Sequence, residues 1–390
     1  MPRGVAIAAA SELPPGRYPH MTVLDLYEEA VSLLLREWHL SPRMIDGLLC
    51  APAGMARGEE TDIFTHERLA YALGLRPTFA ETVNAGGATY ALMVQRACWA
   101  IKEGVASAVL CLGAGKFPSV SRGGADAMAR MVSHPHFEYI YGAYIVPLYA
   151  LIARRFMHER GTTPQEMAAM AVAARQWAML HPHALMRGAG PLSVDDVLAS
   201  RPIAEPFHLL DCSVPCEGGG ALVVARDDVA MEINPRPAHI LGWGEFHSHG
   251  YVTWAPELAT AGARWSIEQA YARAGLGPSD IRVAELYDAF TICPIILLEE
   301  AGLARRGEGG RLFAQGHCSP GGPLPVNTYG GLLSYSHTGD ASGLSMIVEG
   351  ALQVMGRAGA RQVPEAEVVL VHTYGGMMAE HSTLILGRRR

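Results

Sequence analysis

The chain has 390 residues, 49% of them hydrophobic, which is typical of a folded protein with two or three domain-sized units. Its formal net charge is −7, and the 31 Lys and Arg residues are scattered except for a short run at 388–390, so nucleic-acid binding is not expected. The seven cysteines form no Cys-x-x-Cys pair, which favours reduced thiols in a cytoplasmic protein. No apolar stretch of about 18 residues occurs, so no membrane-spanning helix is expected.

Hydrophobic spacing predicts alternating strands and helices from the N-terminus onward. In this first part, strands are expected at 4–11, within 41–52 and at 106–115, and helices at 22–40, 64–75 and 88–104. The strand at 4–11 indicates that the N-terminus belongs to the mature fold rather than to a signal peptide. Alternation of this kind predicts a parallel sheet with helices on both faces.

The middle of the chain interrupts this alternation. Residues 116–205 are rich in Met, His, Tyr and Arg, with helices expected near 143–160, 164–180 and 193–199. After a strand at 221–228, the alternation resumes, with strands at 238–246, 281–290, 366–376 and 381–387 and helices at 263–276, 291–301 and 343–356. The repeated order predicts two similar halves, 1–115 plus 206–230 and 231–390, with 116–205 inserted as a helical lobe.

Four stretches rich in Gly, Asn, Tyr and His follow predicted strands. They are VNAGGAT (83–89), YDAF (287–290), NTYGGLLSYSHTGDASG (327–343) and HTYGGMMAEHSTLIL (372–386). Because ligands bind beyond the carboxyl ends of parallel strands, we expect these stretches to meet at one pocket. The first has the form of a nucleophile-bearing turn, yet it contains no Cys and no Ser.

In their order along the chain, these stretches and residues 206–226 resemble the thiolase superfamily, in particular its sterol-carrier-protein-type branch. The resemblance covers nearly the whole chain. It implies an α/β fold of five layers (αβαβα) built from two similar halves with a helical loop domain, a tight homodimer and a coenzyme A thioester substrate. It also places the strand at 106–115 near the dimer interface. Cysteine-lacking members often work with a small zinc-ribbon/OB-fold acyl-CoA-binding protein, which implies such a partner here.

The departures from the thiolase pattern concern the catalytic residues. Alignment with the family puts Gly87 at the nucleophilic cysteine, His372 at the second cysteine, and Tyr287 and Asp288 in the Asn-Glu-Ala-Phe motif, so that only His337 is retained. Glycine cannot accept an acyl group, which excludes an acyl-enzyme at this turn. The backbone amides of Gly87 and Gly376 are left as candidates to bind an oxyanion.

The resemblance implies chemistry through a thioester enolate, with His337 donating to the thioester oxygen. A retro-aldol step then requires only a base for the β-hydroxyl, and tyrosines are implicated in family members of this kind. The candidates are Tyr287, Tyr329 and Tyr335, and His372 is a further catalytic candidate.

The remaining candidates concern substrate binding. Asp288 either binds substrate or caps the helix at 291–301. Asn327 is expected at the same site, and the acyl tunnel is expected to be lined by Met131, Tyr141 and Tyr144. No metal and no covalently bound cofactor is expected, since coenzyme A enters only as part of the substrate. His-containing stretches such as HSHG (247–250) lack a third ligand.

Three functions compete at this level. The leading hypothesis is an enzyme that makes or breaks a carbon–carbon bond of an acyl-CoA, most concretely a retro-aldolase acting on a β-hydroxyacyl-CoA. The second is a non-catalytic subunit that holds acyl-CoA for a partner. The third is an acetyltransferase whose nucleophile has moved to Cys318 or Cys293.

Overall fold

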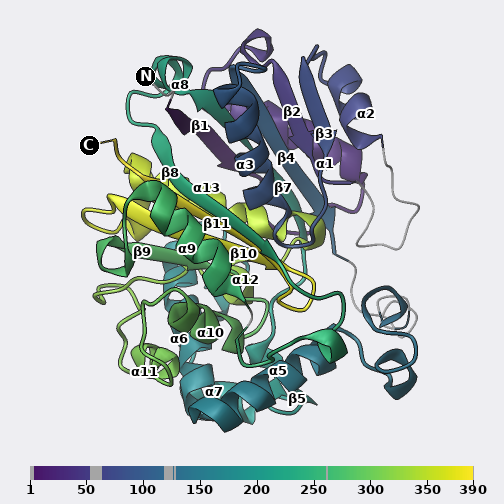
Figure 1. The fold of residues 1–390 in the computed structure, drawn as a ribbon, viewed down its shortest axis with the longest axis vertical. Coiled ribbons are helices and arrows are strands. Elements are labelled where there is room, and N and C mark those ends of the chain that lie inside the picture. Colours follow the sequence, from purple (N-terminus) through teal and green to yellow (C-terminus); the bar gives the residue numbers. More distant parts are fainter. Residues whose placement is uncertain (1–3, 53–63, 118–125, 127–128, 261, 390) are drawn as a thin grey trace.

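The computed structural model describes residues 4–52, 64–117, 126, 129–260 and 262–389 (Figure 1). Within this part of the chain a nine-stranded sheet has the order β3-β2-β4-β7-β1-β8-β11-β10-β9. Its strands are β1 (Val5–Glu12), β2 (Gly47–Cys50), β3 (Phe79–Thr82), β4 (Ala108–Lys116), β7 (Glu217–Arg226), β8 (Ala238–His247), β9 (Val283–Leu286), β10 (Val368–Gly375) and β11 (Glu380–Gly387). A separate pair joins β5 (Pro202–Ala204) to β6 (Phe207–His208).

The strand order repeats, which confirms the expectation of two similar halves. The order in the first half, starting from β1, is β1-β7-β4-β2. The order in the second half, starting from β8, is β8-β11-β10-β9, so that β7, β4 and β2 correspond to β11, β10 and β9. The directions repeat as well, and a single bridge between Ala284 and Val326 stands where the first half has β3. Within the sheet, the two halves are joined by the β1–β8 ladder, which has two residue pairs.

One expectation about the strands was wrong. The sheet is mixed rather than parallel: among the described strands, β2–β3, β2–β4 and β9–β10 are parallel pairs and the others are antiparallel. The tight turn at 376–379 joins β10 to β11 as a hairpin, which can only be antiparallel. The strand expected near a dimer interface, β4, has hydrogen-bonded neighbours on both sides, and the edge strands of the described sheet are β3 and β9. The position of β4 near a dimer interface stays a prediction.

Helices form three layers around the two halves of the sheet. The central helices α3 (Thr89–Lys102) and α13 (Ser342–Met355) contact strands of both halves and are buried on nearly every side. The outer layers contain α1 (Val23–Glu37), α2 (Thr65–Ala72) and α8 (Asp227–Ile233) on one side and α9 (Ala263–Ala274) and α10 (Ile292–Glu300) on the other. This is the five-layer αβαβα fold that the sequence resemblance implied.

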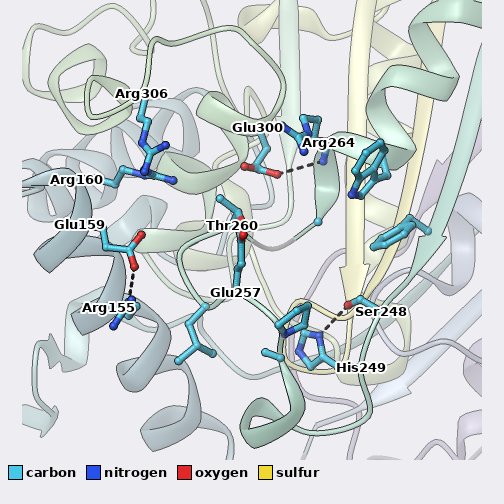
Figure 2. A pocket seen from close by; sticks show the side chains of 16 residues that line it. Arg155, Glu159, Arg160, Ser248, His249, Glu257, Thr260, Arg264, Glu300 and Arg306 are labelled. Carbon is cyan, nitrogen blue, oxygen red and sulfur yellow. Dashed lines mark hydrogen bonds and ion pairs between the residues drawn. The ribbon is translucent and has the colours of Figure 1, made fainter.

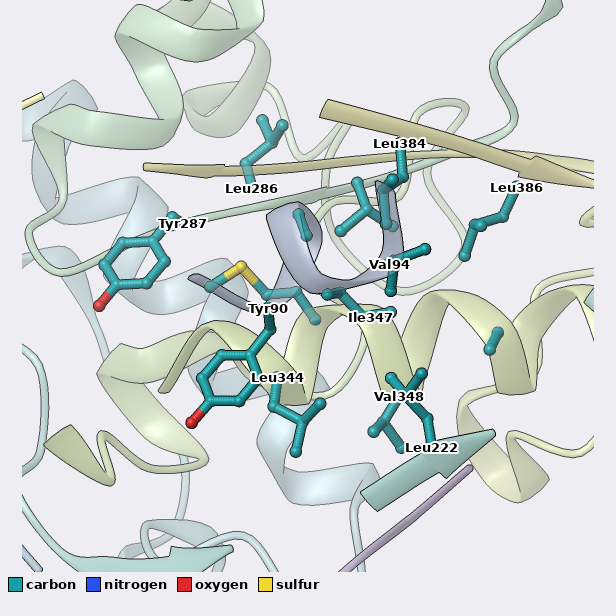
Figure 3. Packing of buried hydrophobic residues seen from close by; sticks show 14 of the residues in the cluster. Tyr90, Val94, Leu222, Leu286, Tyr287, Leu344, Ile347, Val348, Leu384 and Leu386 are labelled. Atoms are coloured by element: carbon teal, nitrogen blue, oxygen red, sulfur yellow. The ribbon is translucent and has the colours of Figure 1, made fainter. Parts of the chain in front are cut away.

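Figure 3 shows how the central layer packs. Apolar side chains of α3 and α13 pack against apolar side chains of the strands of both halves. The labelled helix residues are Tyr90, Val94, Leu344, Ile347 and Val348, and the labelled strand residues include Leu222, Leu286, Leu384 and Leu386. The starting points of helices in these layers are fixed by nearby side chains. At α1, for example, Thr22 and Asp25 form a capping box. The core therefore holds the first turns of α3 and α13 at fixed positions.

The inserted segment is helical, as its composition predicts. It contains α5 (Ile145–Arg160), α6 (Pro164–Leu180) and α7 (Val194–Ala199), which lie at the bottom of Figure 1 together with α11 (Gly309–Ala314) and close to α12 (Gly331–Ser334). Thr163 and Glu166 form a capping box that starts α6 at Pro164. None of the described helices has the length and apolarity needed to cross a membrane.

Candidate functional site

The turn between β3 and α3 is held by its own polar side chains. Asn84 accepts a hydrogen bond from the Gly86 amide at 3.2 Å. The Thr89 hydroxyl accepts from the Ala85 amide at 2.8 Å and donates to the Gly86 carbonyl at 2.6 Å. These contacts fix the backbone around Gly87 before any ligand binds.

The space beside Gly87 is filled by a tyrosine. A Cβ atom at this position would lie 2.5 and 2.6 Å from two ring carbons of Tyr287 and 2.3 Å from the carbonyl oxygen of Tyr374. Real Cβ atoms essentially never come this close to other atoms. The volume that an acyl-accepting side chain would need is therefore occupied by the ring of Tyr287 and the backbone of β10.

The first turns of the two central helices meet at the same point. A Cβ atom on Gly343, in the first turn of α13, would lie 2.2 Å from the Gly87 carbonyl oxygen, just before α3 begins. Neither helix has an acidic residue in its first turn. Helix N-termini carry partial positive charge, so this junction favours a developing negative charge.

The Tyr287 hydroxyl lies between Ser342 and His337. Its oxygen is 2.7 Å from Ser342 Oγ and 3.4 Å from His337 Nε2. His337 Nδ1 accepts a hydrogen bond from the Gly339 amide at 3.2 Å, so the neutral ring carries its proton on Nε2. Enclosure by the protein lowers the pKa of His337 to about 4, which keeps the ring neutral at pH 7. His337 is thus a neutral donor directed toward Tyr287.

Three further aromatic residues surround Tyr287 and His337. The ring of Tyr374, on β10, lies 4.7 Å from that of Tyr287. Tyr149, on α5, donates from its hydroxyl to the Gly376 carbonyl at 2.8 Å. Phe117 contacts the His337 ring edge-on at 5.2 Å. The structure thus brings Gly87, Gly376, Tyr287 and His337 together, although no hydrogen bond from the amides of Gly87 or Gly376 to another described residue is found.

Asp288 and Asn327 bind backbone groups. The Asp288 carboxyl accepts from the Leu332 amide at 2.8 Å, at the start of α12, and not from α10, which the sequence indicated as its alternative partner. Burial raises the pKa of Asp288 to about 8. Asn327 pairs both its amide groups with the backbone of Leu286, at 2.7 and 2.8 Å. Both side chains brace the loop beside Tyr287, and a direct role in substrate binding stays a prediction.

His372 lies in β10 with both ring nitrogens paired. Nδ1 is 2.8 Å from Thr383 Oγ1, and Nε2 is 3.2 Å from Nδ1 of His381, whose own Nε2 donates to the Met378 carbonyl. Burial lowers the pKa of His372 well below its ordinary value. The ring therefore belongs to a buried network of the β10–β11 hairpin, and its catalytic role stays a prediction.

Tyr329 and Tyr335 line a different cavity from Tyr287. This cavity of about 700 Å³ also contains Glu12, Trp38 and Arg361. The Tyr335 hydroxyl interacts with Glu12, and burial raises the pKa of both tyrosines well above the ordinary value. The two residues flank His337 in sequence, but their side chains point toward the junction of β1, α6 and α13.

The expected tunnel residues are mostly open to solvent. Met131 and Tyr141 are 60% and 80% exposed, and Tyr144, just before α5, is half-buried. The proposed alternative nucleophiles are the opposite case. Cys318 and Cys293 are fully buried, and burial raises the pKa of Cys318 and brings that of Cys293 to about 12. Both shifts disfavour the thiolate that nucleophilic attack needs, so the structure does not support the relocated-nucleophile hypothesis.

A second cavity, of about 830 Å³, is lined by four arginines and three glutamates (Figure 2). The charged residues of this arginine-lined cavity are Arg155, Arg160, Arg264, Arg306, Glu159, Glu257 and Glu300, and Phe246 and Trp265 also line it. The Arg160 side chain is 5% exposed and forms an ion pair with Glu299 at 3.7 Å, while its Nε and Nη1 atoms have no hydrogen-bond partner among the described residues.

Two elements connect the cavity to the Tyr287 site. Helix α5 carries Tyr149 at one end and Arg160 at the other. Ser248, on the cavity wall, donates from its amide to the Ala379 carbonyl in the turn that follows Gly376. No group of three metal-ligating side chains was found within the described ranges.

Sequence reasoning did not find Ser342, Tyr149, Tyr374 or Arg160. Ser342 is inside a quoted motif, yet nothing in the motif signals a contact with a residue 55 positions away. Tyr149 and Arg160 belong to the inserted lobe, whose folding back on the C-terminal half is not encoded by any local pattern.

The fold and the site define a thiolase-type protein in which a tyrosine stands beside a glycine in place of the nucleophile. A family model described as "Thiolase C-terminal domain-like" matches residues 244–388. A "Steroid side-chain-cleaving aldolase" of Thermomonospora curvata is 32% identical over 100% of this chain and 99% of its own. A "17-hydroxy-3-oxo-4-pregnene-20-carboxyl-CoA lyase" of Mycobacterium tuberculosis is 34% identical over 93% of this chain and 94% of its own.

A solved structure, "Ltp2-ChsH2(DUF35) aldolase", matches with a TM-score of 0.87 and 31% identity, and the match covers 99% of this chain and 98% of that chain. The chain belongs to the thiolase superfamily, within the branch of thiolase-like carbon–carbon lyases. This confirms the family expected from the motifs.

Proposed function

We propose that this protein cleaves the Cα–Cβ bond of a β-hydroxyacyl-CoA by a retro-aldol reaction, with Tyr287 as the base and His337 as the donor to the enolate. One observation carries the proposal. The Tyr287 ring fills the space that an acyl-accepting side chain needs, and its hydroxyl lies within 3.4 Å of His337 Nε2. The site therefore offers a proton-transfer group and an enolate donor, and position 87 has neither a side chain nor the space for one that could accept an acyl group.

The reaction balances within this set of groups. Ionised Tyr287 takes the proton of the β-hydroxyl, the oxygen lone pair forms the new carbonyl, and the Cα–Cβ bonding electrons pass into the thioester enolate. The Nε2–H group of His337 and the amides of Gly87 and Gly376 stabilise the enolate oxygen. The proton on Tyr287 then returns to the α-carbon, so no net proton is gained or lost. The first turns of α3 and α13 favour the negative charge at each stage.

The relatives suggest the substrate class. In the name of the mycobacterial lyase, the hydroxyl is on carbon 17 and the thioester is borne by carbon 20, which makes the compound a β-hydroxyacyl-CoA. The other relative is named for cleavage of a steroid side chain. By this analogy the substrate here is a CoA thioester with a β-hydroxyl on a bulky alicyclic ring, and the products are a ketone and a shortened acyl-CoA.

We assign the coenzyme A phosphates to the arginine-lined cavity. The buried guanidinium of Arg160 lines it and is ion-paired with Glu299 at 3.7 Å, but its Nε and Nη1 atoms form no hydrogen bond with a described residue, and phosphate oxygens can accept from them. Trp265 on the same wall provides an aromatic face for the adenine. The approach along α5 then delivers the thioester toward Tyr287.

Two partners are part of the proposal. A homodimer would pair the β3 edges of two copies, since β3 is one of the two edge strands of the described sheet and the other, β9, is bridged by Val326. A small zinc-ribbon/OB-fold protein would complete acyl-CoA binding, by analogy with the solved aldolase whose name joins two proteins. A cytoplasmic location stays a prediction.

The test is an assay of ketone and acyl-CoA release from a β-hydroxyacyl-CoA, with and without the small partner protein. We expect Tyr287→Phe to lower kcat by about 10²- to 10⁴-fold, the usual contribution of an acid–base group. Tyr329→Phe and Tyr335→Phe should have much smaller effects, because these side chains line the other cavity. Tyr271→Phe is the matched control, since that buried hydroxyl donates to the carbonyl oxygen of Ala301, just after α10.

Two results would contradict the proposal. If Tyr335→Phe or Tyr329→Phe abolishes activity while Tyr287→Phe does not, the base is misassigned. If the wild type binds acyl-CoA with its partner present but cleaves no β-hydroxyacyl-CoA, the chain is a binding subunit.

A further inference from the structure

Ser342 lies beside the proposed base, Tyr287, but takes no part in the proton transfers of the proposed reaction. It is the first residue of α13 and is 1% exposed. Its Oγ lies 2.7 Å from the Tyr287 hydroxyl oxygen and 2.9 Å from the Gly339 carbonyl oxygen, to which it donates. Ser342 therefore contacts the proposed base directly, from the side of the helix N-terminus.

The hydrogen-bond acceptors near Tyr287 indicate which atom carries each proton. The Gly339 amide donates to His337 Nδ1, which leaves His337 Nε2 as a donor toward Tyr287. Because Ser342 donates to the Gly339 carbonyl, it accepts the Tyr287 hydroxyl proton. The four groups form a closed ring of hydrogen bonds that begins and ends at Gly339. In this state the Tyr287 hydroxyl is directed toward α13.

The charge that Tyr287 must carry as a base calls for a stabilising group. Among the described titratable residues, Tyr149 on α5, Tyr374 on β10, Tyr329 and His337 interact with Tyr287. Burial raises the pKa of the three tyrosines and lowers that of His337, so these four are uncharged near neutral pH. A dipole that points its positive end at the Tyr287 oxygen would therefore stabilise a tyrosinate more than these four neighbours do.

We propose that Ser342 is the positioning residue for Tyr287, accepting its hydrogen bond while the tyrosine is protonated and donating to the phenolate oxygen when it is ionised. The change requires only rotation of the Ser342 hydroxyl from the Gly339 carbonyl to the Tyr287 oxygen. The location of Ser342 at the start of α13 adds the helix dipole to the same oxygen. This inference rests on the proposed retro-aldol function, in which Tyr287 is the base.

The experiment compares Ser342→Ala with Ser342→Thr, in the wild-type and Tyr287→Phe backgrounds. We expect Ser342→Ala to lower kcat by about 10- to 100-fold, the range for loss of a hydrogen bond to a charged group, with KM nearly unchanged. The acid limb of its kcat–pH profile should move to higher pH, because ionised Tyr287 loses a donor. Ser342→Thr keeps the hydroxyl and should restore most of the rate.

The double variant separates positioning from structure. In the Tyr287→Phe background, Ser342→Ala should cause no further loss of rate, since its effect acts through the tyrosine hydroxyl. The matched control is Ser345→Ala, one turn along α13, whose hydroxyl binds Glu12 and lies outside the ring. It should retain wild-type kcat and the wild-type pH profile.

The outcomes are distinct. If Ser342→Ala keeps the wild-type pH profile, or lowers the rate equally in both backgrounds, Ser342 has only a structural role and the inference is overturned. If Tyr287→Phe retains full activity, or the wild type cleaves no substrate, the proposed function itself fails.

Discussion

Replacing Gly87 with cysteine would restore the side chain that a thiolase uses, and we expect it to damage this protein. The new Cβ atom would lie 2.3 Å from the Tyr374 carbonyl oxygen and 2.5 and 2.6 Å from the Tyr287 ring. Ordinary van der Waals contact begins near 3.4 Å, so the ring and the backbone must each move by about 1 Å. The backbone is part of β10, which pairs with β9 and β11, so most of the movement falls on Tyr287.

The expected cost follows from overpacking. Adding side-chain atoms to a filled core costs about 1–3 kcal/mol, which lowers the melting temperature by roughly 2–4 °C per kcal/mol in a domain of 150–250 residues and by less in a longer one. The displaced Tyr287 hydroxyl would also leave Ser342 and His337, so retro-aldol cleavage should fall as for Tyr287→Phe. Thiolytic activity should not arise, because the ring and the new thiol compete for one volume.

Differential scanning calorimetry and the cleavage assay check both expectations. Gly188→Ala is the matched control, because a Cβ atom there meets nothing within 4 Å. In the Tyr287→Ala background, Gly87→Cys should cost less stability than in the wild type, because two of the three close contacts are then absent, and cleavage should not return. A Gly87→Cys protein with wild-type melting temperature and wild-type cleavage would refute the steric argument and, with it, the position of the Tyr287 ring.

Three other changes test separate parts of the site. His337→Ala should lower kcat by about 10²- to 10³-fold through loss of an enolate donor, measured with saturating β-hydroxyacyl-CoA; an unchanged rate would mean that the enolate lies elsewhere. Arg160→Leu should raise KM for the acyl-CoA by about 10-fold or more but not for the corresponding acyl-pantetheine, which carries no phosphate group; equal effects on both would remove the cavity from the CoA site. His372 has a folded-state pKa below its unfolded value, so its contribution to stability is complete above pH 6.5 and is lost as the pH falls below it. The difference in melting temperature between the wild type and His372→Gln should therefore shrink on acidification from pH 7 to pH 5, and a constant difference would contradict the buried neutral ring.

Local sequence was sufficient for the long helices and most strands of the two halves and for their repeated order, but not for the short helices α8, α11 and α12. The capping signals at Thr22 and Thr163 act within three residues, and the apolar residues of α3 and α13 indicate that these helices are buried nearly all round. Once the motif had placed Gly87 at the nucleophile position, the absence of a side chain was enough to exclude an acyl-enzyme there. The family could be inferred for the same reason, since its motifs are contiguous stretches read in order.

The choice among the candidate side chains was made only by the tertiary structure. Tyr287 follows a strand, and Tyr329 and Tyr335 lie in the same glycine-containing motif. The sequence does not indicate toward which part of the protein any of the three rings points. Contacts across 50 and 55 residues set Tyr287 against His337 and Ser342, while Tyr335 turns to Glu12 at the far end of the chain. Strand direction was undetermined for the same reason, since alternation of strands and helices does not state which strand becomes the neighbour of which. A side chain's direction depends on the packing of elements distant in sequence, and that packing arises only when the whole core closes.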